Sequence, residues 1–153
     1  MGYLPSVLEN LGLVPAIRAL CKEFSAQHGV EVGFTSGGVP RSVHPDVTLC
    51  MYRIVQEGLA NFKKHSGAQQ ALVSLRVNAE EVSVSVLDKG CGFDMQQVSH
   101  GLGVRSMEER VRSLSGDFMI QSAPGKGTAV SAWVPLAIRI GWRARNFQTE
   151  SGS

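Results

Sequence analysis

Two consecutive segments that alternate between apolar and polar residues constrain the fold of this chain most strongly. Residues 71–77 and 81–88 each alternate with period two, which predicts strands with one apolar face. The residues between them, Asn78 to Glu80, fit a turn. Paired strands of this kind, mixed with helices, favour a two-layer α/β sandwich over a doubly wound parallel sheet.

Helical patterns surround the paired strands. Apolar residues recur at helical spacing in three segments, 11–27, 46–65 and 104–114. Further strands are predicted at 30–35, 118–122 and 128–134. A glycine-rich stretch over 89–103 is long enough to be a functional loop. The order α-β-α-β-β-loop-α-β-β therefore predicts a mixed sheet with three helices on one face.

Composition places the chain among soluble, single-domain proteins. Its 153 residues allow one sizeable core, and 43% hydrophobic and 18% charged residues are ordinary values. A formal net charge of +2, without a block of Lys and Arg, argues against a nucleic-acid partner. The three cysteines are odd in number and widely spaced, which favours a reducing cytosol. No run approaches about 18 apolar residues, so we expect no membrane contact from this chain.

The helix predicted over 46–65 carries two different faces. Its apolar stripe consists of Met51, Val55, Leu59 and Phe62. A separate polar face gathers Arg53, Glu57, Asn61, Lys64 and His65. One interpretation is the solvated side of an amphipathic helix. The other rests on Asn61, because a mid-helix asparagine is a poor helix former that solvation does not require, whereas its amide oxygen suits a hard cation.

Asp88 ends the second of the paired strands. Period two places it on the same face as Val82, Val84 and Val86, which points its carboxylate toward the interior. A buried carboxylate needs a partner. It is either a turn aspartate that caps Gly90 or an acceptor for the exocyclic amine of a purine.

Two pairs of glycines follow Asp88. Gly90 and Gly92 would let the backbone pass close to a ligand, because glycine has no Cβ. Gly101 and Gly103 precede the helix expected from residue 104, and the N–H groups of a helix N-terminus attract phosphate. The chain has no G-x-x-x-x-G-K-[ST] sequence, and its Gly101-Leu102-Gly103 segment lacks the third glycine of a dinucleotide fingerprint.

Four motifs in order are more specific than each alone: Glu57-x-x-x-Asn61-x-x-Lys64-His65, Asp88-x-Gly90-x-Gly92, Gly101-x-Gly103 and Gly125-x-Gly127-Thr128. Together they resemble the N, G1, G2 and G3 boxes of the GHKL ATPase superfamily, which has the Bergerat fold. Histidine kinases, gyrase-type topoisomerases, chaperones and anti-sigma kinases share these boxes. Segments 52–61, 101–110 and 123–128 look like sensor histidine kinases of the nitrate-sensor type.

The resemblance implies a division of the chain. Residues 13–136 would form the ATP-binding catalytic domain, 1–12 the end of a dimerisation hairpin or linker, and 137–153 a C-terminal tail.

The resemblance also implies roles for single residues. Asn61 would hold Mg²⁺ against the ATP phosphates, and Glu57 would lie near the metal and its water as a base or a metal-shell acceptor. Asp88 would accept a hydrogen bond from the adenine amine. Lys64 and His65 would contact phosphate or ribose. Gly90, Gly92 and Thr128 would lie around the base, and the phosphates would also be bound by Gly101, Leu102 and Gly103. Residues 93–100 would be the nucleotide lid.

The activity that the resemblance implies is transfer of the ATP γ-phosphoryl group to a histidine, and from there to a response regulator, in the cytoplasm. Acceptor histidines of this family are followed by an acidic residue, and none of His28, His44, His65 and His100 is. We therefore expect the acceptor on a dimerisation domain outside this chain, and this chain alone to be monomeric. The resemblance leaves open whether the parent protein is membrane-anchored. Two alternatives are an anti-sigma-type protein serine kinase and a degenerate GHKL scaffold that binds no nucleotide.

Overall fold

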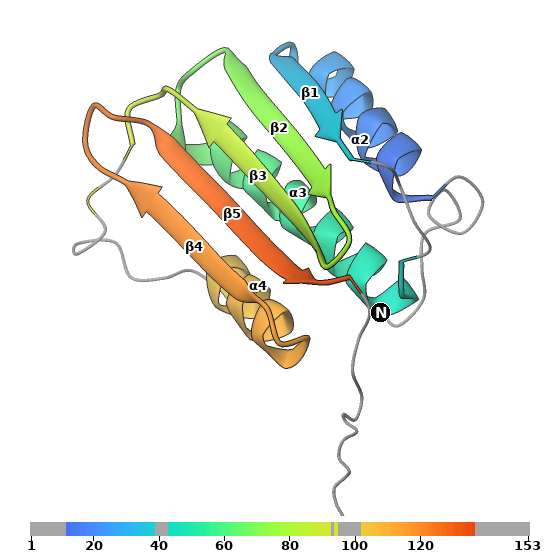
Figure 1. The fold of residues 1–153 in the computed structure, drawn as a ribbon. Coiled ribbons are helices and arrows are strands. Elements are labelled where there is room, and N and C mark those ends of the chain that lie inside the picture. Colours follow the sequence, from blue (N-terminus) through green and yellow to red (C-terminus); the bar gives the residue numbers. More distant parts are fainter. Residues whose placement is uncertain (1–11, 39–42, 93, 95–101, 137–153) are drawn as a thin grey trace, which may run out of the picture.

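The computed structural model describes residues 12–38, 43–92, 94 and 102–136 (Figure 1). Its elements are α2 (Leu13–His28), β1 (Glu31–Gly37), α3 (Pro45–His65), β2 (Gln70–Val77), β3 (Glu81–Asp88), α4 (Leu102–Ser113), β4 (Asp117–Ser122) and β5 (Thr128–Pro135). Their types and order are those predicted from the sequence.

The strands of the described part form one mixed sheet in the order β1-β2-β3-β5-β4 (Figure 1). β1 and β2 pair in parallel, and their connection runs through α3. The other neighbours pair antiparallel. The turn between β2 and β3 is closed by Asn78, whose Oδ1 accepts hydrogen bonds from the backbone N–H groups of Glu80 and Glu81, each at 2.8 Å.

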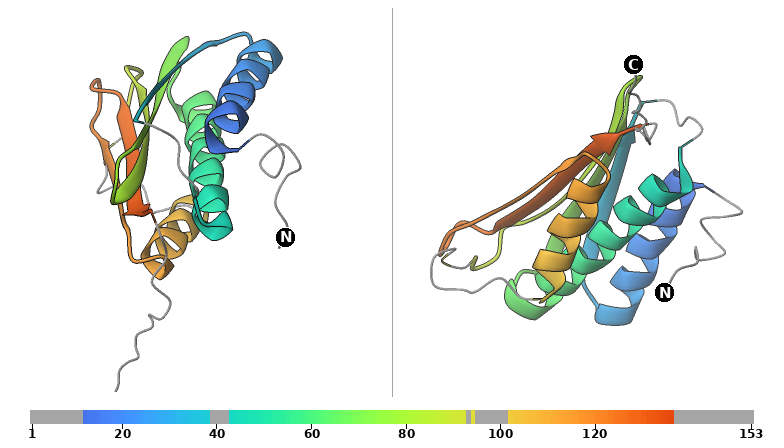
Figure 2. Two further views of the ribbon diagram at one scale, coloured as in Figure 1. Left: turned by 45° about the vertical axis from the view of Figure 1, so that its right-hand side comes forward. Right: turned by 90° about the horizontal axis from the view of Figure 1, so that it is seen from below.

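Helices α2, α3 and α4 all lie on one face of this sheet, so the predicted two-layer α/β sandwich is confirmed (Figure 2). The alternation of the strands follows from this arrangement, because every second side chain turns toward the helices. The strand residues buried on that side are Ala71, Val73, Leu75, Val77, Val82, Val84, Val86, Phe118, Val130, Ala132 and Val134.

Helix α3 occupies the middle of the core. The apolar stripe predicted from its sequence is buried throughout, with Met51 and Val55 fully inaccessible and Leu59 and Phe62 at 1% and 2% exposure. Close packing on β3 depends on Gly58, since a Cβ atom there would lie 2.8 Å from Val86 Cγ2. The polar face of α3 is thereby held at a fixed position beside the end of β3.

Helix boundaries differ slightly from the predictions for local reasons. α3 begins at Pro45, one residue early, because proline is pre-organised for the first helical position, and the Asp46 N–H donates to His44 Nδ1 at 3.1 Å. α4 begins at Leu102, two residues before the predicted start. Leu102 and Gly103 therefore lie in the first turn of α4.

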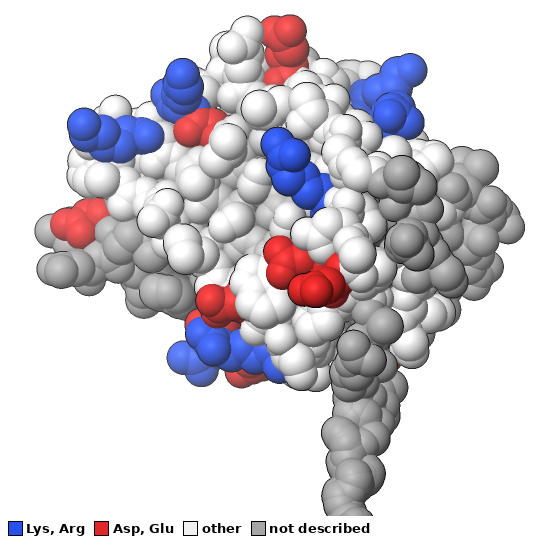
Figure 3. Space-filling view, viewed as in Figure 1, with Lys and Arg blue, Asp and Glu red and all other residues white. Residues whose placement is uncertain are grey.

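The face of the sheet away from the helices, called here the open face, is uncovered within the part of the chain that is described. It carries four exposed large apolar side chains, those of Leu72, Leu87, Met119 and Trp133. Charged side chains of both signs are scattered over this face (Figure 3). None of the helices described here is both long and apolar enough to span a bilayer.

Candidate nucleotide-binding site

The C-terminal end of α3 meets the end of β3 and the start of β5 between the two layers. The strand register pairs Asp88 with Thr128, so these two side chains lie next to each other on the side of the sheet that faces the helices. A small cavity at this place offers about 20 Å³ to water-sized molecules. It is lined by Gly58, Asn61, Phe62, His65, Ser66, Val86, Asp88, Ile120, Thr128 and Val130. The structure thus brings together Asn61, His65, Asp88 and Thr128, which come from three separate motifs.

Asp88 uses one carboxylate oxygen for the protein itself. Its Oδ1 accepts hydrogen bonds from Ser66 Oγ at 2.9 Å and from the Gly90 N–H at 2.8 Å. The turn-capping interpretation of Asp88 is therefore confirmed. Among the described residues, no hydrogen bond reaches its Oδ2. Capping a turn and accepting from a ligand use different oxygens, so the two interpretations do not compete.

Ser66 was not predicted as part of the site. It caps the C-terminus of α3 and is only 4% exposed. Its carbonyl oxygen accepts from the Cys91 N–H at 2.8 Å, and its Oγ accepts from the Ala68 N–H at 3.1 Å. In the sequence, Ser66-Gly67 signals only the end of a helix, and its contact with a loop more than twenty residues later has no local signature.

Close packing within the protein explains why the loop after β3 contains glycines. A Cβ atom on Gly90 would lie 1.8 Å from Ser66 Oγ. A Cβ atom on Gly92, which has a φ of 65°, would lie 2.1 Å from the Ala123 carbonyl oxygen. The space beside both glycines is therefore filled by the protein, and contact of Gly90 and Gly92 with a ligand stays a prediction.

Hydrogen bonds of Cys91 join the loop after β3 to its neighbours. The Gly125 N–H donates to the Cys91 carbonyl oxygen at 2.6 Å, and Cys91 Sγ donates to the His65 carbonyl oxygen at 3.1 Å. The loop is thus tied to the turn before β5 on one side and to the end of α3 on the other.

Thr128 is held by a second serine. Its Oγ1 lies 2.9 Å from Ser122 Oγ, and Ser122 Oγ donates to the Gly127 carbonyl oxygen at 3.0 Å. Ser122 was also not predicted from the sequence. Its contact with Thr128 arises from the β4–β5 register, which pairs the two residues.

The polar face of α3 is arranged as its spacing predicts. Glu57 and Asn61 are half-buried, whereas Lys64 and His65 are exposed in the last turn. Asn61 and His65 line the cavity, but Glu57 and Lys64 do not. The side chains of Glu57 and Asn61 make no hydrogen bond or ion pair with any described residue, so neither is committed to a structural partner there.

Part of the predicted phosphate site cannot be placed. Gly101 lies outside the described residues, as does the predicted lid over 93–100 apart from Asp94. Leu102 and Gly103 lie in the first turn of α4, where backbone N–H groups have no partner within the helix.

The residues present suit a weakly held metal that is bound together with its substrate. No group of three or more His, Cys, Asp or Glu side chains in the described ranges could hold a metal ion by itself. Mg²⁺ does not require such a group, because it keeps several waters and uses one or two protein ligands together with substrate phosphates. Asn61, with Glu57 one turn earlier on the same helix, fits that mode.

Two of the three cysteines, Cys21 and Cys50, are excluded as nucleophiles. Burial raises the pKa of the Cys21 and Cys50 thiols to about 12. For Cys50 the nearby Arg110 opposes this shift only in part. Cys91 is exposed and, like the other two, forms no disulfide.

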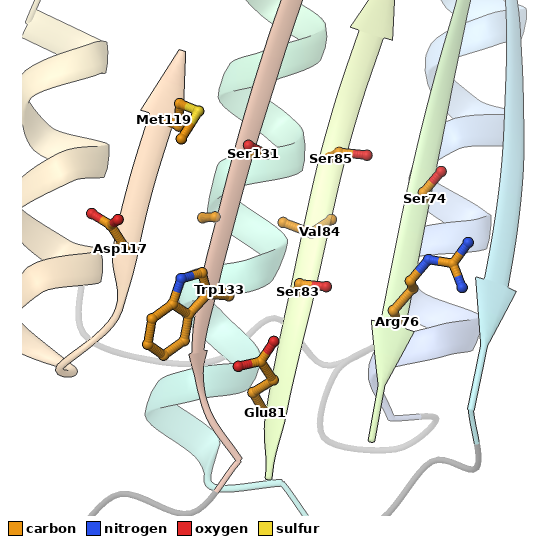
Figure 4. A pocket seen from close by; sticks show the side chains of 11 residues that line it. Ser74, Arg76, Glu81, Ser83, Val84, Ser85, Asp117, Met119, Ser131 and Trp133 are labelled. Atoms are coloured by element: carbon orange, nitrogen blue, oxygen red, sulfur yellow. The ribbon is translucent and has the colours of Figure 1, made fainter. Parts of the chain in front are cut away.

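The described part of the molecule has two larger hollows. One of about 300 Å³ is a shallow depression on the open face, lined by Arg76, Glu81, Asp117 and Trp133 among others (Figure 4). It contains none of the predicted site residues. A second, of about 640 Å³, extends from the open face to Asp88 and Lys89. The small cavity beside α3 is preferred as the site because of its side chains and not because of its size.

Comparison with known proteins agrees with this geometry. Residues 46–138, more than half of the chain, match the family described as histidine kinase-, DNA gyrase B-, and HSP90-like ATPase. The chain is 33% identical over 135 residues to the sensor histidine kinase MctS of Rhizobium johnstonii, with 86% of this chain and 29% of that protein covered. It is 32% identical over 130 residues to the signal transduction histidine-protein kinase/phosphatase DegS of Brevibacillus brevis, with 84% and 34% covered. The chain thus spans about a third of the length of these curated relatives.

Solved structures show the same fold. The histidine kinase domain of the Erythrobacter litoralis EL346 blue-light activated histidine kinase superposes with a TM-score of 0.63 at 21% identity, covering 78% of this chain and 59% of that one. A longer structure of that kinase gives a TM-score of 0.66 at 21% identity, with 81% and 42% covered. On the family match and the arrangement of its motifs, this chain belongs to the histidine kinase-, DNA gyrase B- and HSP90-like ATPase family, with sensor histidine kinases among its relatives.

Proposed function

We propose that the chain is the ATP-binding catalytic domain of a sensor histidine kinase of the nitrate-sensor type. The complete protein would transfer the γ-phosphoryl group of ATP to a histidine on its dimerisation domain and then to a response regulator. The observation that carries this proposal is the meeting of Asn61 and His65 with Asp88 and Thr128 around one cavity. The subtype rests on segments 52–61, 101–110 and 123–128.

In this proposal, Asp88 and Thr128 bind the base. Asp88 Oδ2 accepts a hydrogen bond from the exocyclic amine of adenine, with Gly90 and Gly92 in the adjoining loop. The cavity has room for about one water molecule, which is far smaller than a purine. Binding therefore requires the cavity walls to move apart, and the energy for this must come from stacking of the base and from contacts to the phosphates.

The polar end of α3 binds the metal and the phosphates. Asn61 coordinates Mg²⁺ through its amide oxygen, and Glu57 acts as a base or accepts a hydrogen bond from metal-bound water. Lys64 and His65 contact phosphate or ribose, while the Gly101-Leu102-Gly103 segment provides backbone N–H groups at the start of α4. Catalysis by such a site is mainly positioning and charge neutralisation.

The boundaries of the catalytic domain follow the resemblance. Residues 13–136 form the domain, 1–12 the end of a dimerisation hairpin or linker, and 137–153 a tail. ATP as the substrate places the domain in the cytoplasm. Dimerisation is assigned to the histidine-bearing domain, so this chain alone is monomeric.

The test compares the complete protein with this chain. Incubated with γ-labelled ATP and Mg²⁺, the complete protein should gain acid-labile phosphate on a histidine. This chain alone should retain none, because transfer needs an imidazole nitrogen in line with the γ-phosphorus and none of its histidines has an acceptor sequence. Acid-stable phosphate on a protein serine would instead support the anti-sigma-type activity. Stable phosphohistidine on this chain alone would contradict the placement of the acceptor outside it.

A further inference from the structure

Two serines that belong to none of the motifs contact the two polar side chains assigned to the base. Ser66 contacts Asp88, and Ser122 contacts Thr128. The two contacts determine the orientation of the Asp88 carboxylate and of the Thr128 hydroxyl. These orientations determine whether the cavity binds a hydrogen-bond donor or an acceptor of a ligand. The inference rests on the proposed nucleotide site and concerns its selectivity for the base.

The contact of Ser66 orients the Asp88 carboxylate. A serine hydroxyl has one proton to donate. Ser66 Oγ donates it to Asp88 Oδ1 at 2.9 Å and accepts from the Ala68 N–H at 3.1 Å. The Gly90 N–H donates to the same carboxylate oxygen at 2.8 Å. With two donors on Oδ1 and a 4% exposed serine behind it, the carboxylate cannot rotate freely, and Oδ2 stays available as an acceptor.

The contact of Ser122 determines the orientation of the Thr128 hydroxyl. Ser122 Oγ donates its proton to the Gly127 carbonyl oxygen at 3.0 Å. Either hydroxyl could donate in the 2.9 Å contact between them, but a serine has one proton, so with that proton on Gly127 the donor to Ser122 is Thr128. Thr128 Oγ1 then presents only lone pairs to the cavity that it lines.

We propose that Ser66 and Ser122 are positioning residues: Ser66 holds the Asp88 carboxylate, which is itself an acceptor, with Oδ2 available, and Ser122 takes the Thr128 proton so that this hydroxyl also acts as an acceptor. The register places Asp88 and Thr128 opposite each other on β3 and β5, so both acceptors lie at one place. An amino group, which has two protons, suits this pair. A carbonyl oxygen at the same place meets lone pairs from both sides. The serines thereby select a 6-aminopurine against a 6-oxopurine.

The experiment titrates this chain and its variants with the Mg²⁺ complexes of ATP, GTP and purine riboside triphosphate, which has hydrogen in place of the 6-amino group. Ser66→Ala should lower ATP affinity by about fivefold to tenfold, the effect of one hydrogen bond, with a smaller loss for the purine analogue. Ser122→Ala frees the Thr128 proton, so the preference for ATP over GTP should fall by a similar factor. Ser122→Thr keeps a hydroxyl and should restore the preference.

The matched control is Ser85→Ala, since Ser85 lies on β3 but on the open face (Figure 4). It should change none of the three affinities. If affinities for all three nucleotides fall together in Ser66→Ala and Ser122→Ala, the serines are merely structural and the inference is wrong. If the unaltered chain itself binds ATP and GTP equally, the adenine assignment fails first. Because Ser122 is half-buried, its variants keep the test decisive even if Ser66→Ala does not fold.

Discussion

At the residue scale, Glu57 and Asn61 of α3 make no side-chain hydrogen bond or ion pair with a described residue. Asn61 is half-buried, and its side chain makes no hydrogen bond to a described residue, so its amide oxygen is open to a ligand. The metal-binding interpretation of Asn61 and the solvated-face interpretation both fit this placement, and the role of Asn61 as an Mg²⁺ ligand stays a prediction.

Replacing Asn61 should separate metal binding from base binding. Asn61→Ala should weaken Mg-ATP by about 10- to 100-fold, since hydrogen bonds and ligation that involve charged groups are the strong ones. Metal-free ADP should bind almost as before. Calorimetric titration of both ligands measures this, with Lys63→Ala as a control on an exposed neighbour. Equal losses for both ligands would mean that Asn61 is structural.

The buried thiols predict a loss of stability in alkali. In the unfolded chain a cysteine has its ordinary pKa of 9.0, whereas burial raises the pKa of Cys21 and Cys50 to about 12 in the folded protein. Between these values the unfolded state releases protons that the folded state keeps, so stability is complete below pH 9 and declines as the pH rises toward 12. The decline is about 1.4 kcal/mol per pH unit for each fully shifted thiol.

Urea unfolding at pH 8, 9, 10 and 11 measures this decline. The variant with Cys21→Ala and Cys50→Ala provides the control, because other groups that titrate in this range, Tyr52 among them, remain in it. Its stability should fall less steeply with pH than that of the unaltered chain. Identical slopes would show that the two thiols do not contribute.

At the element scale, the packing of α3 on β3 holds the two halves of the site together. Asn61 and His65 lie on the helix and Asp88 on the strand, so their separation depends on the close contact at Gly58. Any increase in the distance between α3 and β3 would therefore change both the core and the cavity.

Gly58→Ala tests this contact. In an open helix position, replacing Gly by Ala stabilises by about 1 kcal/mol. Here the new Cβ would lie 2.8 Å from Val86 Cγ2, so we expect a net destabilisation of about 1–3 kcal/mol in the free energy of unfolding. In a Val86→Ala background the same change should cost less, since the clash is removed. A more stable Gly58→Ala protein would refute the close contact.

Elements were predictable from the sequence to within about two residues, because each has a clear period. The alternation around Val82 and Val84 and the stripe of α3 both arise from burial on one side only. The network around the cavity was only half predictable. Asp88 was found through its place on the strand, but Ser66 and Ser122 act through contacts set by loop packing and strand register, for which a single sequence has no signal.

At the scale of the whole molecule, the two-layer arrangement concentrates the candidate site at one end of the helix layer, and no described element covers the opposite face of the sheet (Figure 2). Motifs that are far apart in the sequence meet there because β5 lies between β3 and β4 in the sheet. This strand order brings Thr128 next to Asp88 although forty residues separate them.

The central claim is that this arrangement binds adenine nucleotide. It is tested most directly by calorimetric titration of this chain with Mg-ATP and, in parallel, with Mg-GTP. Guanine presents an oxygen where adenine has its amine, and leaving the acceptors of the site unpaired costs about 1–3 kcal/mol. We therefore predict that ATP binds about 5- to 150-fold more tightly than GTP. Equal affinities would contradict the role of Asp88, and a chain that binds neither nucleotide would be a scaffold without the proposed activity.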